Sequence, residues 1–384
     1  MENEIHFGRV DKTNLVKSDN RLVGAIWTES KVKTMNKYSF LLALVMLITL
    51  TDMSASRAQS AVQNSSQAAQ TTFIAEPITV ETPTGMLYGR LEWPQSRSPV
   101  PVVLIISGSG PTDRDGNSPM LKGPNNSLKL LAEGLAAQGI ASVRYDKRGI
   151  GETGKAMQLA AEKAKTMLRE EELSFETYID DAVAWGKKLG GDRRFSSLTV
   201  LGHSEGSLIG MVAAQRMGAH AYVSIAGSGR RLQQIILEQV KSQLPPDLLK
   251  PTQEILEQLA AGKRVESVPP ALNVIFRQSA QPYLISWLRY DPMKEIAKLH
   301  IPIFITQGTT DIQASWRDPK ALADADPAAT LLLIDGMNHV LKTVPNEMDK
   351  QVSSYSDPTL AVAPGLISGI SSFVIKVKWQ RPSR

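Results

Sequence analysis

The chain contains no cysteine among its 384 residues. Disulfide bonds, thiolate nucleophiles and cysteine-ligated metal sites are therefore excluded. The lack of cysteine is compatible with an oxidising compartment and does not prove one. Histidine is also scarce, since the chain has only five, so any function that needs an imidazole depends on very few positions.

The chain also has little excess charge of either sign. It carries 43 Lys and Arg against 38 Asp and Glu, a formal net charge of +5. Residues 1–58 hold eight of the basic and six of the acidic residues, which leaves 35 against 32, or +3, for the remainder. A charge balance this even gives no indication of a nucleic-acid partner or of a membrane-surface protein.

One hydrophobic run, at residues 38–50, follows Lys31, Lys33 and Lys37 and is followed by small and polar residues. This order is typical of a secretory signal peptide, and the run is short for a membrane span, which needs about 20 residues. An uncleaved signal anchor is the alternative. Because a signal normally begins at the chain's own start, we predict an upstream extension (1–34), a signal peptide starting near Met35 (35–58) and a flexible lead-in (59–74). The mature protein is then expected to be secreted or periplasmic, with no stable membrane span.

The rest of the chain, residues 75–384, alternates short apolar strands with helical patterns and shows no internal repeat. Strands are predicted at 78–82, 86–91, 100–106, 141–145, 198–201, 222–225, 303–306 and 330–334. Such alternation predicts an α/β fold with a mostly parallel central sheet and helices on both faces. From about 230 to 295 the strand patterns stop and amphipathic helical patterns predict a cap insertion.

The pentapeptide Gly202-His203-Ser204-Glu205-Gly206 follows one of these strands and opens a helical pattern. A turn this sharp places the serine at its apex, and glycines on either side avoid collisions with the strand and the helix. The sequence context therefore predicts that Ser204 is a nucleophile. The alternative is an ordinary glycine-flanked turn.

A serine nucleophile needs a base, and the base needs an orienting acid. His339 lies in the loop after the last strand, at the sheet edge where Ser204 is expected. The side chain of His203 should point away from the apex, so we expect its substitution to change stability more than chemistry. Asp311, after the penultimate strand, is the predicted acid, since Asp335 lies too close behind its own strand.

A tetrahedral oxyanion needs two aimed N–H donors. The amide of Glu205 is one, because it opens the helix after Ser204. The second should come from the loop Ser107-Gly108-Ser109-Gly110, and its position after the strand favours Ser109. Gly108 and Gly110 remain alternatives.

Five motifs in this order resemble the α/β-hydrolase superfamily, and more narrowly its esterase branch with serine-aminopeptidase-like relatives. They are residues 105–117 (IISGSGPTDRDGN), 144–151 (RYDKRGIG), 202–206 (GHSEG), 307–311 (QGTTD) and 336–339 (GMNH). The resemblance covers about residues 75–380 and implies an α/β-hydrolase fold. Many such hydrolases carry His-Gly where this chain has Ser107-Gly108, which leaves the second oxyanion donor in doubt.

We therefore predict a serine hydrolase that cleaves small-molecule carboxylic esters through an acyl-enzyme, with no metal or organic cofactor. The alternatives are a peptidase or amidase with the same triad, and a non-catalytic binding protein, for which a broken triad would be expected. Three side chains of the insertion either line an acyl pocket or simply pack on the core, and core packing is the expectation for any single one of them. An acidic and basic cluster either shapes the mouth of the site or pairs internally. The side chains of the insertion are Tyr283, Trp287 and Leu288, and the cluster consists of Asp113, Arg114 and Asp115. The sequence does not indicate an oligomeric state.

Overall fold

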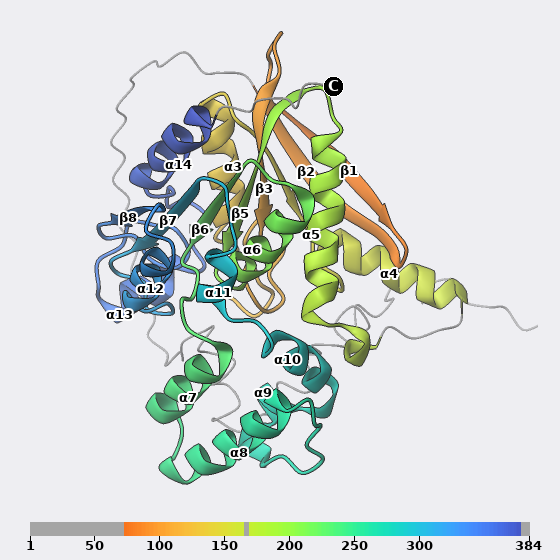
Figure 1. Ribbon diagram of the computed structural model, residues 1–384, viewed down its shortest axis with the longest axis vertical. Coiled ribbons are helices and arrows are strands. Elements are labelled where there is room, and N and C mark those ends of the chain that lie inside the picture. Colours follow the sequence, from red (N-terminus) through yellow and green to blue (C-terminus); the bar gives the residue numbers. More distant parts are fainter. Residues whose placement is uncertain (1–72, 165–168, 378–384) are drawn as a thin grey trace, which may run out of the picture.

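The computed structural model describes residues 73–164 and 169–377 (Figure 1). The predicted extension, the predicted signal peptide and the lead-in up to residue 72 lie outside the described residues. The last two lead-in residues, Phe73 and Ile74, begin the first strand rather than a flexible segment.

The described residues form one eight-stranded sheet in the order β1-β2-β4-β3-β5-β6-β7-β8. The first two strands form an antiparallel hairpin, β2 is antiparallel to β4, and every later pairing is parallel. This architecture confirms the predicted fold class. The strands are β1 (Phe73–Thr82), β2 (Gly85–Pro94), β3 (Val100–Ile106), β4 (Ala141–Tyr145), β5 (Phe195–His203), β6 (Ala221–Ile225), β7 (Ile303–Gly308) and β8 (Thr330–Ile334).

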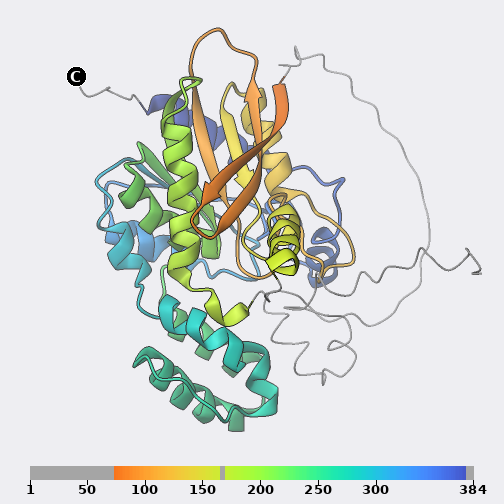
Figure 2. The same ribbon diagram turned by 90° about the vertical axis from the view of Figure 1, so that its right-hand side faces the viewer.

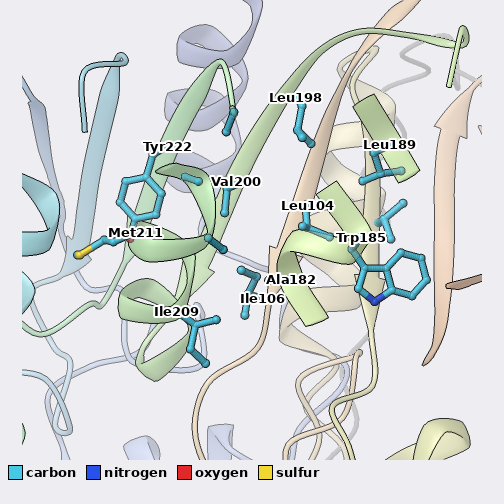
Figure 3. Close-up of a cluster of buried hydrophobic side chains, with 14 of the residues drawn as sticks. Leu104, Ile106, Ala182, Trp185, Leu189, Leu198, Val200, Ile209, Met211 and Tyr222 are labelled. Carbon is cyan, nitrogen blue, oxygen red and sulfur yellow. The ribbon is translucent and has the colours of Figure 1, made fainter. Parts of the chain in front are cut away.

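Helices cover both faces of the sheet, and the alternation along β3 shows why. Leu104 and Ile106 pack toward α5 and α6 (Figure 3), whereas Val103 and Ile105 join the core beneath α3 and α14. Successive residues of a strand point to opposite faces, so a strand buried on both sides reads as a continuous apolar run. The helices of the sheet domain are α3 (Ser127–Ala137), α4 (Gly151–Ala164), α5 (Phe175–Gly190), α6 (Glu205–Met217), α12 (Arg317–Ala325), α13 (Met348–Ser354) and α14 (Pro364–Lys376).

Most of the chain between β6 and β7 forms the helical cap, which lies at one end of the molecule in Figures 1 and 2, whereas the last helix of this segment packs beside α6 and α12. The cap has an apolar cluster of its own, which includes Ile236, Val240, Leu256 and Phe276. The helices of the cap are α7 (Leu232–Gln243), α8 (Leu249–Ala260), α9 (Asn273–Phe276) and α10 (Gln281–Trp287), and the segment returns to the sheet domain through α11 (Pro292–Ile296). Within the described ranges, no helix has both the length and the apolar character that crossing a membrane requires.

Candidate active site

Ser204 lies at the apex of the turn between β5 and α6, with φ 55° and ψ −121°. A positive φ is uncommon for a residue with a side chain and marks a strained turn. A Cβ on Gly202 would lie 2.1 Å from the Gly206 carbonyl oxygen, and one on Gly206 would lie 2.4 Å from the Ile106 carbonyl oxygen. Both flanking positions therefore require glycine, because the start of α6 lies so close to β5 at Gly202 and to the end of β3 at Gly206.

Asp311 and His339 meet although they follow different strands. His339 Nδ1 lies 2.9 Å from Asp311 Oδ2, and both side chains are almost fully buried. Asp311 Oδ1 accepts hydrogen bonds from the backbone amides of Gln313 (2.8 Å) and Ala314 (2.9 Å). Burial by itself would raise the pKa of Asp311, but the nearby His339 and these hydrogen bonds outweigh it and lower the pKa below its usual value.

The rival acid, Asp335, lies elsewhere. Its carboxylate accepts a hydrogen bond from the Thr309 hydroxyl at 3.0 Å, at an exposed position behind β8. The structure thus pairs His339 with the aspartate that the sequence indicated and not with the one nearer in the chain.

Ser204, His339, Ser109 and Glu205 all line one cavity of about 930 Å³ between the sheet and the cap. Gly108 packs directly beside the nucleophile candidate, since a Cβ on it would lie 3.1 Å from Ser204 Cβ. The loop after β3 and the amino end of α6 therefore face the same space. Helix amino ends present amides without intrahelical partners, which suits them to bind developing negative charge.

His203 contacts His339 directly, which its position next to Ser204 in the sequence did not suggest. Its ring stacks at a tilt against the ring of His339, with centroids 4.8 Å apart, and its Nε2 donates to the His339 carbonyl oxygen at 2.9 Å. Burial, followed by the proximity of His339, lowers the pKa of His203 to about 3. A neutral His203 therefore holds the backbone of the loop that carries His339. Strand alternation predicts that the side chain of His203 points away from the Ser204 apex, so it does not reveal the contact with His339.

The cap supplies much of the cavity's apolar lining. Tyr283 and Trp287 line the cavity, one of the two roles open to them, whereas Leu288 is 3% exposed and packs in the cap's own core. The other apolar residues that line the cavity from the cap are Leu232, Ile235, Ile236, Val274, Ile275 and Leu284.

In the cluster after β3, the ion pairs of Arg114 and Asp115 run to other elements and not to one another. Arg114 binds Asp146 at 2.7 Å, and Asp115 binds Arg144 at 2.7 Å, so the two residues tie the loop to β4 and to the residue that follows it. Only Asp113 of the three lines the cavity, and its Oδ1 accepts the backbone amides of Asp115 and Asn117.

Lys147 is a residue that the sequence reasoning missed. It follows β4 inside the motif at residues 144–151, it is 4% exposed, and its ammonium contacts the loop after β3 and the Glu205 carboxylate. The signal that could have found it is a lysine directly after a buried strand, at the sheet edge that carries Ser204.

Strand order, a strained serine at a strand-to-helix turn, and a following Asp–His pair together define the α/β-hydrolase class. The chain belongs to the family described as "Serine aminopeptidase, S33", whose model matches residues 126–345, more than half of the chain.

Among curated proteins, the chain is similar to Esterase EstD of Thermotoga maritima, with 30% identity over 259 residues. The match covers 66% of this chain and 58% of that relative, so the chain spans less than two thirds of the relative's length.

Solved structures show the same fold at low sequence identity. Est1E from Butyrivibrio proteoclasticus with bound ferulic acid has a TM-score of 0.50 and 16% identity, covering 78% of this chain and 98% of that one. The DcsB complex with its substrate analogue also has a TM-score of 0.50 and 16% identity, covering 80% and 100%.

Proposed function

We propose that this chain is a serine hydrolase that cleaves carboxylic esters through an acyl-enzyme. Ser204 is the nucleophile, His339 its general base and Asp311 the acid that orients the imidazole. The observation that carries the proposal is the 2.9 Å contact between His339 Nδ1 and Asp311 Oδ2, beside a cavity that also exposes a strained serine.

In each step of the proposed reaction, His339 accepts the proton that is released and later returns it. Ser204 Oγ attacks the ester carbonyl carbon while His339 Nε2 takes the hydroxyl proton. The tetrahedral intermediate then collapses, the bond to the alcohol oxygen breaks, and His339 returns the proton to the leaving alcohol. Water then attacks the acyl-enzyme carbonyl while His339 takes its proton. The bond to Ser204 Oγ breaks, His339 returns the proton to that oxygen, and the carboxylic acid is released. The amides of Glu205 and Ser109 stabilise the oxyanion in both halves, and no step calls on a metal or an organic cofactor.

The cavity supports esters with a large apolar group. Its volume of about 930 Å³ is near the upper end of ordinary small-molecule sites, and side chains from α7, α9 and α10 give it an apolar wall. A medium-length acyl chain or an aromatic acyl group would bury its surface there, with its carbonyl at Ser204.

Ester hydrolysis is favoured over the aminopeptidase activity that the family description names. An aminopeptidase must bind a substrate ammonium, for which an available carboxylate is the natural partner. Of the acidic side chains that line the cavity in the described part of the chain, Glu170, Glu205 and Asp318 pair with Arg277, Lys147 and Arg230. The fourth, Asp113, already accepts two backbone amides at its Oδ1, and burial raises its pKa.

The test compares p-nitrophenyl esters of increasing acyl length with aminoacyl arylamides, using the wild type and Ser204→Ala. We expect turnover of the esters to rise with acyl length up to the limit of the cavity and to fall by about three orders of magnitude or more in Ser204→Ala. Near-wild-type turnover by the variant would contradict the proposed nucleophile. Faster cleavage of the arylamides would make the peptidase the better description.

We also propose that the mature protein is exported, on the strength of the signal-like pattern at residues 35–58. The natural protein's amino terminus should then lie between about residues 57 and 62, which N-terminal sequencing would reveal. A natural cytoplasmic protein that retains residues 1–34 would contradict this.

A further inference from the structure

A buried lysine contacts both candidate parts of the oxyanion hole. The Lys147 ammonium donates to the Gly108 carbonyl oxygen at 2.5 Å and lies 3.6 Å from Glu205 Oε1. It also lies over the ring of Tyr178, 5.7 Å from the centroid. The side chains of Lys147 and Glu205 are each 5% exposed. Taking two charges out of water is costly, so such a pair requires a reason beyond packing.

The contact with Gly108 controls the orientation of a peptide unit. In a trans peptide the C=O and the N–H point in opposite directions, and no cis bond occurs in the described parts of the chain. The Gly108 carbonyl points at the ammonium, so the Ser109 N–H of the same unit points away from Lys147. Because Gly108 packs against Ser204, a rotation of this unit would displace the loop amides relative to the nucleophile.

The contact with Glu205 restrains the other donor. The Glu205 amide is the first of α6, and its carboxylate is held by Lys147 from the sheet domain and by the Tyr283 hydroxyl from the cap. A single ammonium thus links the residue that carries one candidate donor to the peptide that carries the other.

We propose that Lys147 is a positioning residue that aligns the two oxyanion amides through the Gly108 carbonyl and the Glu205 carboxylate. The proposal rests on the proposed hydrolase function, and it assigns Lys147 no contact with the reacting atoms. Burial lowers the pKa of Lys147 although the neighbouring Glu205 opposes this shift, and the N–H that donates to Gly108 is present in either protonation state.

The test uses Lys147→Met, the double variant Lys147→Met/Glu205→Met, and Asp181→Asn as a matched control. The control breaks a similarly buried ion pair, between Asp181 and Arg148 at 2.5 Å, whose acid does not line the cavity. The double variant removes both charges, so it leaves no carboxylate unpaired and guards against simple misfolding.

We expect kcat for a p-nitrophenyl ester to fall about 10- to 100-fold in both Lys147 variants, less than the 10²- to 10³-fold loss typical when an oxyanion donor is deleted outright. KM should change by less than about threefold, because the ground-state carbonyl makes little use of the hole. Asp181→Asn should lower Tm while kcat stays within about threefold of the wild type.

A trifluoromethyl ketone, which forms a tetrahedral adduct with the serine, gives a second readout. Its inhibition constant should rise in the Lys147 variants by the same factor by which kcat/KM falls. Unchanged kcat and inhibition constant in the folded variants would overturn the positioning role, as would a loss confined to KM. Ser204→Ala separates the two proposals, since an active Ser204→Ala enzyme refutes the hydrolase mechanism itself.

The absence of cysteine permits a chemical rescue. Lys147→Cys would carry the chain's only thiol, which can be aminoethylated in denaturant to place an ammonium nearly where the lysine had it. After refolding, this adduct should regain most of the lost kcat, whereas an S-propyl adduct, which has the same length but no N–H to donate to Gly108, should not. Equal activity of the two adducts would contradict the proposal.

Discussion

Asp311→Asn is the substitution for which the structure gives the most detailed expectation. Asparagine keeps the shape of aspartate but replaces one oxygen with an NH₂ group. Because Asp311 Oδ1 accepts the amides of Gln313 and Ala314, the oxygen of the introduced carboxamide must occupy that position. The NH₂ group is then turned toward His339 Nδ1, which must accept a hydrogen bond instead of donating one.

The imidazole is thereby driven into the tautomer whose Nε2 carries the proton. An Nε2–H cannot accept the Ser204 proton, so the base is lost without any change of shape. The same exchange in the best-studied serine protease lowers kcat about 10⁴-fold, equivalent to about 5.5 kcal/mol of barrier, and we expect a similar loss here. The assay is p-nitrophenyl ester turnover at pH 7, with Tm measured in parallel.

Asp335→Asn is the matched control, because Asp335 is the other candidate acid and contacts Thr309. Its turnover should stay within about twofold of the wild type. The reasoning fails if Asp311→Asn keeps more than about a tenth of the activity, or if both variants lose activity equally.

Two further expectations concern the turn and the loop beside it. Gly206→Ala should prevent correct folding of the turn, because its Cβ would lie 2.4 Å from the Ile106 carbonyl oxygen; a soluble, active variant with unchanged Tm would contradict this. Unfolded histidine binds a proton below pH about 6.5, whereas folded His203, with a pKa of about 3, does not, so stability is retained above pH 6.5 and lost as the pH falls. From pH 7 to pH 5 this costs about 2 kcal/mol. Urea titrations should show a smaller loss in His203→Gln, and an identical loss would contradict the assignment.

The sequence predicted the sheet and the order of the site residues because these depend on local patterns. Buried strands such as residues 100–106 read as continuous apolar runs, and the glycines around Ser204 reflect a packing requirement at one turn. Asp311 was separable from Asp335 because a position next to the strand end limits the reach of a side chain.

Contacts across the fold were not predictable in this way. The ring of His203 reaches His339 from another element, and Lys147 reaches Gly108 and Glu205 through the tertiary arrangement of three loops. Leu288 belongs to the same helical pattern as Trp287, yet one faces the cap's core and the other the cavity. Periodicity places residues on a face, but it does not say which neighbour that face meets.

The central claim is that Ser204 is a nucleophile activated by His339 and oriented through Asp311. Its most direct test is the reaction of the protein with diethyl p-nitrophenyl phosphate, followed by mass spectrometry of the labelled peptide. Ser204 Oγ should bond to phosphorus and release p-nitrophenolate, with about one phosphoryl group per chain at full inactivation. Wild-type label on the Ser204 peptide, and almost none in Ser204→Ala or His339→Ala, is the predicted result. Label on another residue, or full ester turnover after stoichiometric labelling, would contradict the account.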